Sequence, residues 1–412
     1  MMTTLTKVLA LVLMIALTFE TPSPEPAAPT MTGQERAEML QQLEQTQDLE
    51  ECLRLGTALE LEQIDVERFR AAPEELDALY EQMLATTSLP WFTEMAWSLQ
   101  MGGDGKVVSF QPQYLDPADY DRICYEKAVE EALAQAVHPG MTELQIALSL
   151  HDYLAVRCAY DETLVLGTEY DALVRGSAVC QGYAEAYMDL LGRVGIECII
   201  VTSEEMNHAW NQVKLGGQWY NVDLTWNDPT PNREGQACHG FFLISDGTMA
   251  SEDYGYYGWV SPHECTDPGY ETGQFWSDSI SPVLYPEAGS CYLVRVVESG
   301  YHILRRDEVT GEETRLAWMD FKYPDAFARG GRRIHFYTAG LSTDGEALYY
   351  TDVNGVRRLD LASGEVSTVY EHDVSATREM LVGSFLEGDT LYLTAMDTSQ
   401  EVRSMEVPYL AG

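Results

Sequence analysis

The sequence predicts an α+β protein in which a helical, a mixed and a strand-rich segment follow one another. Three observations lead to this fold class. Apolar residues recur at helical spacing over residues 33–98. In the middle of the chain, helical patterns alternate with strand patterns that include a glycine-turn hairpin. From residue 286 onward, short alternating runs are separated by turn dipeptides. A chain of 412 residues has room for two or three domains.

Residues 1–32 are interpreted as a signal peptide or N-terminal anchor followed by a linker. Lys7 supplies a short positive region, and the apolar run from Val8 to Phe19 has the length of a signal-peptide core. This run is short for a membrane-spanning helix. Residues 21–30 are rich in Pro and Ala, which is typical of an extended linker. We therefore expect a secreted or extracytoplasmic protein, with no integral membrane domain beyond a possible anchor.

The charge balance is strongly acidic. Lys and Arg total 25 against 66 Asp and Glu, for a formal net charge of −41. Such a surface repels phosphate backbones, so a nucleic-acid partner is excluded. It suits a soluble protein or one that attracts cationic partners.

The second segment, residues 33–105, is predicted to be mainly helical. Residues 33–61 carry apolar side chains at mixed three and four spacing among many Glu and Gln. Residues 73–88 form another helical pattern with Pro73 near its start. The glycines of residues 102–105 predict a turn, and a strand is expected at residues 106–115.

The third segment, residues 106–285, alternates helices and strands. Amphipathic helices are predicted at residues 117–137 and 141–160, the second capped by Thr142 with Gln145 three residues on. A loop follows at residues 161–178, and a further helix begins at Cys180. Strands are predicted at residues 197–203, in the hairpin near residues 207–228, and at residues 240–246.

The hairpin turn fixes which residues of the two strands lie opposite each other. Gly216 and Gly217 suit a two-residue turn, which places Leu215 opposite Gln218 and, further along, His208 opposite Thr225. Since side chains alternate between the faces of a sheet, this register determines each face.

His208 and Asp223 fall on the same face in this register, as diagonal neighbours within side-chain reach. A carboxylate beside a histidine fixes the tautomer of the imidazole and stabilises its cation. The pair is two thirds of a catalytic triad and lacks a nucleophile.

Cys180, at the start of the predicted helix, can supply that nucleophile. The positive end of the helix dipole and the unpaired N–H groups there lower the pKa of a thiol. A neighbouring imidazole lowers the pKa further, and the same N–H groups can stabilise an oxyanion. Taken alone, the cysteine could equally be half of a disulfide or a packing residue.

Three sequence blocks resemble the core of the transglutaminase-like superfamily of papain-type cysteine enzymes. They are the V-C-Q-G-Y-A, H-A-W-N and W-Y-N-V-D-L-T-W stretches, which stand in the family's order within residues 110–260. The resemblance implies a papain/transglutaminase-like fold in which the cysteine helix packs on an antiparallel sheet. It also implies that Cys180 is the nucleophile, His208 the base and Asp223 the orienting acid.

Other residues are expected near this site. Gln181 and Tyr160 are candidates for the border of a cleft, while Trp210 and Trp226 either wall the cleft or fill the core. His151 is either a group that supports the site or contacts the substrate, or a helix-packing residue, and packing is favoured.

The eight cysteines include no C-x-x-C pair and no surrounding histidine cluster, so a structural zinc site is not expected. Cys158 and Cys198 are interpreted as structural, and a bridge between Cys238 and Cys265 is left open. No calcium loop or phosphate-binding loop is present in the sequence, and we predict no cofactor and no metal.

The fourth segment, residues 286–412, is predicted to be a separate all-β domain. The stretch Y-Y-T-D-V-N-G-V-R-R-L-D-L-A-S-G-E resembles one blade of a propeller. Roughly three such units fit into the segment, too few for a closed propeller.

Together these features predict an exported cysteine enzyme that forms a thioester on peptide or protein amides. Release by water would make it a protease or amidase, and release by an amine a crosslinking transglutaminase; hydrolysis is favoured because water is always available. The expected partner is a protein or peptide substrate, with cell-wall peptide among the candidates. The alternative is a catalytically silent scaffold that binds peptide or cell wall.

Overall fold

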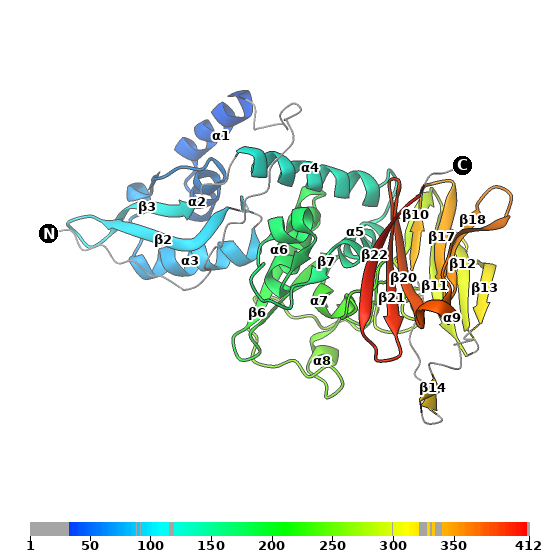
Figure 1. Cartoon of the computed structure of the whole chain (residues 1–412). Coiled ribbons are helices and arrows are strands. Elements are labelled where there is room, and N and C mark those ends of the chain that lie inside the picture. The colour runs from blue at the N-terminus through cyan, green and yellow to red at the C-terminus, as the bar shows by residue number, and fades with distance from the viewer. Residues whose placement is uncertain are drawn as a thin grey trace. The chain divides into compact units, whose positions relative to one another are not determined.

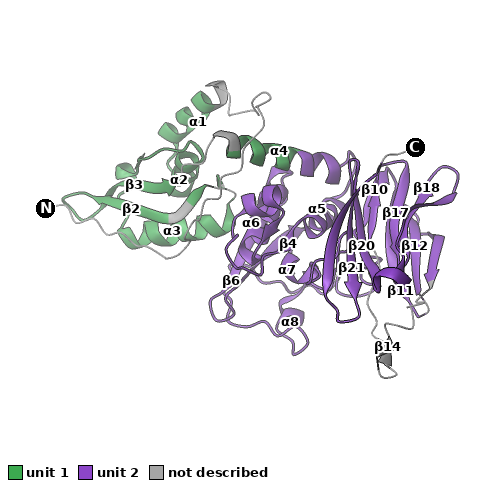
Figure 2. Cartoon of the chain, in the orientation of Figure 1, with its two compact units in different colours: residues 1–130 green, residues 131–412 purple. Residues whose placement is uncertain are grey.

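The computed structural model describes residues 33–87, 89–90, 92–114, 119–298, 300–320, 328–329, 332–333 and 340–409. The chain divides into two compact units, residues 1–130 and 131–412 (Figure 2). No described helix is both long and apolar enough to cross a membrane. The predicted signal or anchor at residues 1–32 lies outside the described residues.

The first unit combines helices with a small antiparallel sheet of order β1-β3-β2. Its helical elements are α1 Gly33–Gln45, α2 Leu49–Ala58, the 3-10 turn η1 Glu67–Phe69, α3 Pro73–Thr86 and the first part of α4 Asp119–Ala136. Its strands are β1 Ile64–Asp65, β2 Thr93–Met101 and β3 Val107–Tyr114. Tyr80 of α3 is fully buried against Trp97 and Phe110 of the sheet, so an aromatic core joins the two layers.

Strand β2 is the longest element of this unit that the sequence analysis missed, and the short elements β1 and η1 were missed as well. Its alternation of Trp97, Leu99 and Met101 with polar residues is a strand pattern. The predicted turn at residues 102–105 joins β2 to β3, so the domain boundary predicted after residue 105 falls inside this hairpin.

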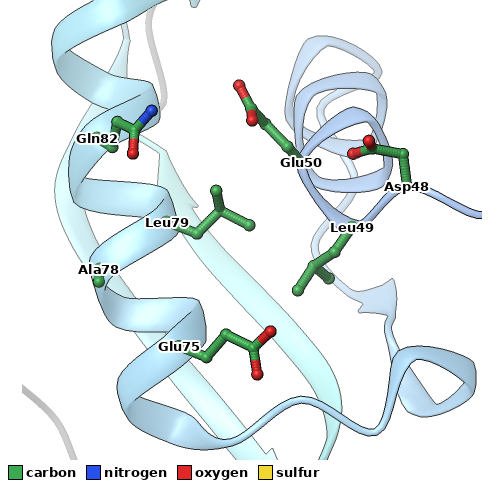
Figure 3. A pocket seen from close by; sticks show the side chains of 7 residues that line it. All are labelled: Asp48, Leu49, Glu50, Glu75, Ala78, Leu79 and Gln82. Atoms are coloured by element: carbon green, nitrogen blue, oxygen red, sulfur yellow. The ribbon is translucent and has the colours of Figure 1, made fainter. Parts of the chain in front are cut away.

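A groove between α2 and α3 has an apolar floor and an acidic rim. In Figure 3, Leu49 of α2 and Leu79 of α3 face each other, with the carboxylates of Glu50 and Glu75 beside them. The remaining lining residues are Asp48, Ala78 and Gln82.

The second unit begins with a core of helices on an antiparallel sheet of order β6-β7-β8-β9. Its helical elements are α5 Glu143–Arg157, the π-turn η2 Asp171–Arg175, α6 Cys180–Arg193, α7 Leu224–Asn227 and α8 Asp246–Met249. Its strands are β4 Ala159–Tyr160, β5 Ser177–Ala178, β6 Cys198–Ser203, β7 His208–Leu215, β8 Gln218–Val222 and β9 Phe242–Ile244. Helix α6 packs on β6 and β7, and α5 packs on α6 and α7 (Figure 1). The predicted arrangement of the cysteine helix on an antiparallel sheet is confirmed.

Helix α6 begins at Cys180, as predicted. Ala184, Tyr187 and Leu191 recur at helical spacing and are buried. At the helix start, a Cβ on Gly182 would come within 2.7 Å of the carbonyl oxygen of Thr168. Only glycine therefore lets the first turn of α6 lie so close to the preceding segment.

The predicted hairpin register is confirmed from Leu215 opposite Gln218 to Asn211 opposite Val222. The predicted pairing of His208 with Thr225 is wrong, because Thr225 belongs to the one-turn helix α7. Asp223 caps this helix by accepting a hydrogen bond from the backbone N–H of Trp226 at 3.2 Å, and the strand therefore ends at Val222.

The rest of the second unit is rich in strands, which confirms the β-rich C-terminal segment. Within the described residues the strands form sheets of order β10-β11-β12-β13, β14-β15, β16-β17-β18-β19 and β20-β21-β22. The strands of the first two sheets are β10 Leu284–Glu287, β11 Ser290–Val297, β12 Gly300–Asp307, β13 Glu313–Asp320, β14 Ala328–Arg329 and β15 Arg332–Arg333. The others are β16 Leu341–Thr343, β17 Ala347–Asp352, β18 Gly355–Asp360, β19 Val366–Glu371, β20 Glu379–Glu387, β21 Thr390–Asp397 and β22 Val402–Pro408, with a short helix α9 Val374–Thr377.

The three larger sheets pack against one another through shared cores. Ile303 of β12 and Leu348 of β17 belong to one core, and Tyr349 of β17 and Leu393 of β21 belong to the next. Each face of β17 therefore contributes to a different core, as in neighbouring blades of a propeller.

Backbone contacts join the helical core of this unit to its strand-rich part. A Cβ on Gly235 would come within 2.1 Å of the carbonyl oxygen of Ser384, and one on Gly383 within 2.5 Å of that of Glu234. The side-chain amide of Gln236 donates to the carbonyl oxygen of Val382. The domain boundary predicted after residue 285 lies inside this compact unit.

Candidate active site

Cys180, His208 and Asp223 come together in the structure. They stand at the first residue of α6, the first residue of β7 and the cap of α7. The Nε2 atom of His208 lies 2.5 Å from the Oδ2 atom of Asp223, and the His208 side chain is also hydrogen-bonded to the thiol of Cys180. The three side chains thus form a line from thiol to imidazole to carboxylate.

The carboxylate determines the tautomer of the imidazole. Asp223 is 1% exposed, and an ionised carboxylate only accepts hydrogen bonds, so Nε2 of His208 carries the proton. This leaves Nδ1 of His208 for the thiol. The indole of Trp210, itself 1% exposed, stacks on the imidazole with the ring centres 5.9 Å apart.

The charges of the site favour a thiolate beside an imidazolium. Burial opposes ionisation of Cys180, but the hydrogen bond and the charge of His208 together bring the pKa of the thiol below its ordinary value. Burial also opposes the charge on His208, yet its hydrogen bonds to Asp223 and Cys180 raise the pKa of the imidazole to about 10. The backbone N–H of Ala209 stabilises the thiolate further by donating to it.

The start of α6 provides hydrogen-bond donors beside the thiol. The first N–H groups of a helix have no acceptor within the helix, and they point toward its N-terminal end. This end of α6 lies at Cys180, beside its thiol. An oxyanion that forms on a carbonyl attacked by Cys180 would therefore meet backbone donors.

Asp223 is held from two further sides. Its Oδ1 atom accepts the hydrogen bond from the N–H of Trp226, and its Oδ2 atom accepts a second hydrogen bond, from the hydroxyl of Tyr256 at 2.5 Å. The sequence analysis missed Tyr256. It lies in an irregular segment after α8, where no periodic pattern indicates which of several tyrosines turns inward.

The four predicted cleft residues differ in their surroundings. Trp226 is 61% exposed and its indole stacks on Phe241, whereas Trp210 is buried behind His208. The side chain of Gln181 donates to Glu185 at 2.7 Å. Tyr160 is half-buried; burial and then the nearby charge of Cys180 raise the pKa of its phenol.

A second histidine–aspartate group lies deeper in the same core. Asp152 accepts hydrogen bonds from His151 at 2.8 Å and from His239 at 2.9 Å, both at Oδ1, and from the backbone N–H of Val283 at Oδ2. Asn227, at the end of α7, reaches Nε2 of His151 at 2.9 Å. His151 therefore supports the end of α7, and Asp223 caps the start of the same helix.

His151, Asp152 and His239 are also the described residues whose spacing would allow a metal ion. Their hydrogen bonds give a different account. Asn227 accepts from the N–H of Phe241 through Oδ1, so its amide nitrogen donates to Nε2 of His151, and Nδ1 of His151 carries a proton toward Asp152. The ligand atoms that face Asp152 are thus already used as hydrogen-bond donors, which fits a structural network better than a metal site.

All eight cysteines lie within the described residues and are free thiols. The bridge between Cys238 and Cys265 that the sequence left open is not formed. Burial raises the pKa of Cys158 and of Cys198, the two cysteines interpreted as structural, and so keeps these thiols protonated.

Comparison with known families assigns the region around the site. Residues 131–224 match the family described as the transglutaminase-like superfamily. This segment contains Cys180, His208 and Asp223. Residues 131–224 are therefore a transglutaminase-like domain, as the sequence blocks predicted.

Two curated relatives and one solved structure are similar to parts of the chain. Kyphoscoliosis peptidase of Mus musculus is 28% identical over 93 residues, which covers 18% of this chain and 14% of the relative. The Homo sapiens protein of the same name is 21% identical over 175 residues, which covers 36% of this chain and 26% of the relative. The chain thus spans about a quarter or less of the length of these relatives. The crystal structure of a TGase aligns with 38% of this chain and 49% of its own, with 13% identity and a TM-score of 0.23.

Proposed function

We propose that this protein is a cysteine acyl-transfer enzyme that acts on peptide or protein amides and that its preferred reaction is hydrolysis. The observation that carries the proposal is the line formed by Cys180, His208 and Asp223 at the start of α6. The transglutaminase-like domain supports it, because members of that superfamily are often cysteine proteases or transglutaminases.

The first half of the reaction forms a thioester. The thiolate of Cys180 attacks the carbonyl carbon of the amide, and the negative charge moves to the carbonyl oxygen near the N–H groups of α6. The carbonyl then re-forms, the C–N bond breaks, and the imidazolium of His208 gives its proton to the departing amine.

The second half of the reaction releases the acyl group. Neutral His208 takes a proton from water as the water oxygen attacks the thioester carbonyl. The C–S bond then breaks, which releases a carboxylic acid and restores the thiolate–imidazolium pair. An amine in place of water would give a transglutaminase. Hydrolysis is preferred because water is always available and because the curated relatives are named as peptidases.

Two expectations from the sequence belong to the proposal. The enzyme would work outside the cytoplasm, on the strength of the apolar run between Val8 and Phe19. Its substrate would be a protein or peptide, cell-wall peptide included, because the site is built to attack a carbonyl and the acidic chain disfavours nucleic acids.

The test compares the wild-type chain with Cys180→Ala on a mixed panel of peptides and glutamine donors, with and without an added amine. We expect turnover by the wild type, loss of turnover in Cys180→Ala, and carboxylic acid as the main product even with amine present. Cys198→Ala is the matched control, because it removes another thiol of the same domain outside the triad. Equal turnover by the wild type and Cys180→Ala would defeat the proposal. Selective binding of a panel peptide without turnover would favour the silent scaffold.

A further inference from the structure

Tyr256 contacts the proposed triad, although no sequence block contains it. Its hydroxyl donates to Oδ2 of Asp223 at 2.5 Å, the same atom that His208 contacts at the same distance. Tyr256 is 4% exposed, so water does not compete for this hydrogen bond.

We propose that Tyr256 is a positioning residue of the thiol–imidazole pair, because its hydroxyl shares the Asp223 oxygen with His208 and so limits how strongly that carboxylate holds the imidazolium proton. This inference rests on the proposed function. It adds a fourth residue that sets the proton affinity of His208 without touching the substrate.

The physical argument concerns the charge on a single oxygen. A carboxylate oxygen that accepts two strong hydrogen bonds presents less charge to each donor than an oxygen that accepts one. The Tyr256 hydroxyl therefore weakens the pull of Asp223 on the proton of His208. An imidazolium that is held less tightly gives its proton more readily to the departing amine.

Hydrogen bonds to the backbone of Tyr256 and of the next residue hold this segment in place. The backbone N–H of Tyr256 donates to the carbonyl oxygen of Met249 at 3.1 Å, and the hydroxyl of Ser203, at the end of β6, donates to the carbonyl oxygen of Tyr257 at 2.8 Å. The ring packs edge-on against Trp210, with the ring centres 5.2 Å apart. The hydroxyl is thus held toward Asp223 before any substrate arrives.

A role in packing alone would not need the hydroxyl. Phenylalanine would occupy the same space beside Trp210 and His208 and would lack the donor to Asp223. The substitution Tyr256→Phe therefore separates the two roles.

The titratable groups that face Asp223 are Tyr256 from the segment after α8, His208 from β7, Cys180 from α6 and His151 from α5. Of these, His151 is kept neutral, because its burial lowers the pKa of its imidazole. The expected pH effects of Tyr256→Phe therefore arise in the thiol–imidazole pair.

The experiment measures the rate at which iodoacetamide alkylates Cys180 as a function of pH, which needs no substrate. In Tyr256→Phe the more strongly held imidazolium stabilises the thiolate, so the midpoint of alkylation moves to lower pH by about one unit. The alkaline limit of kcat/KM moves to higher pH by a similar amount. Tyr254→Phe is the matched control: it also loses a tyrosine hydroxyl, but one that donates to the carbonyl oxygen of Gly240.

Site-specific 3-fluorotyrosine at position 256 provides a second variant if Tyr256→Phe folds poorly. Its more acidic phenol donates a stronger hydrogen bond, so the alkylation midpoint should move to higher pH. Midpoints equal to the wild type in both variants would overturn the inference. A wild-type midpoint near that of an ordinary thiol, about 8.5, would instead count against the proposed function itself.

Discussion

Two histidine–aspartate groups lie at opposite ends of the same one-turn helix, and they differ in what each imidazole contacts besides the carboxylate. At the start of α7, His208 meets Asp223 and turns its other nitrogen to the thiol of Cys180. At the end of α7, His151 meets Asp152 and turns its other nitrogen to Asn227. The side chain of His208 is 11% exposed, and that of His151 is 0% exposed.

The difference teaches that contact with a carboxylate does not by itself determine the charge of a histidine. For His208, the bonds to Asp223 and to the thiol outweigh burial, and the pKa of the imidazole rises to about 10. For His151, burial outweighs the bond to Asp152, and the pKa of the imidazole falls. A reactive partner and some access to solvent make the first group a candidate site, and a buried network without a reactive partner makes the second group structural.

The largest expected effect is a difference between two variants in which the same substitution is made at each of the two histidines. His208→Gln keeps a donor for Asp223 but removes the proton carrier, so kcat/KM should fall by about 10³-fold while the melting temperature stays close to that of the wild type. His151→Gln should leave kcat/KM within several-fold of the wild type but lower the melting temperature. Steady-state kinetics and calorimetry on both variants measure this; similar kinetic losses in the two would break the comparison.

Removal of the carboxylate from the second group should mainly affect stability. Asp152→Ala leaves the N–H groups of His151, His239 and Val283 without their acceptor, so the free energy of unfolding should fall by about 3 kcal/mol. Urea unfolding measures the loss, with Asp253→Ala at an exposed position as the control. A loss no larger than that of the control would show that the second group is not structural.

Asn227 tests whether the two groups communicate through α7. In Asn227→Ala, His151 and the N–H of Phe241 each lose a hydrogen bond, which should cost about 1–2 kcal/mol of unfolding free energy. Because Asp223 caps the other end of the helix, we also expect kcat/KM to fall several-fold. If stability falls while the kinetics stay unchanged, the two groups act independently.

The smallest expected effect concerns the wild-type chain, whose activity should depend on pH. The lowered pKa of Cys180 means that activity should already rise below about pH 8.5, the region where an ordinary thiol ionises. His208 loses its proton as the pH passes its raised pKa, so activity should fall near pH 10. The pH profile of kcat/KM measures both limits. A fall near pH 6.5 instead would mean that His208 has the ordinary pKa of a free histidine.

The sequence predicted the parts of the site that depend on local rules. A two-glycine turn fixes a register, and the register placed His208 and Asp223 on one face. Helical periodicity placed Cys180 at a helix start. The extension of the strand to Thr225 failed, because an aspartate that caps a helix competes with strand pairing, and alternation alone does not show which one prevails.

The remaining contacts join positions that are far apart in the chain. Tyr256 reaches Asp223 from 33 residues downstream, and Asp152 meets Val283 from 131 residues away. Tyr256 and Val283 lie outside helices and strands, where no periodicity predicts which side-chain or backbone groups turn toward the core. Such contacts follow from the tertiary fold, and the residue pattern of one sequence does not contain them.

The glycine contacts at Gly235, Gly340 and Gly383 have a mechanical consequence. Backbone meets backbone there, and the N–H of Leu341 donates to the carbonyl oxygen of Gly235 at 3.1 Å. At these glycines no side chains separate the two backbone segments. Movement of one segment past the other would therefore have to break hydrogen bonds. We therefore expect the C-terminal sheets to hold the segment that follows α7 in a fixed position. The geometry of Asp223 should then depend on strands more than 100 residues away in the sequence.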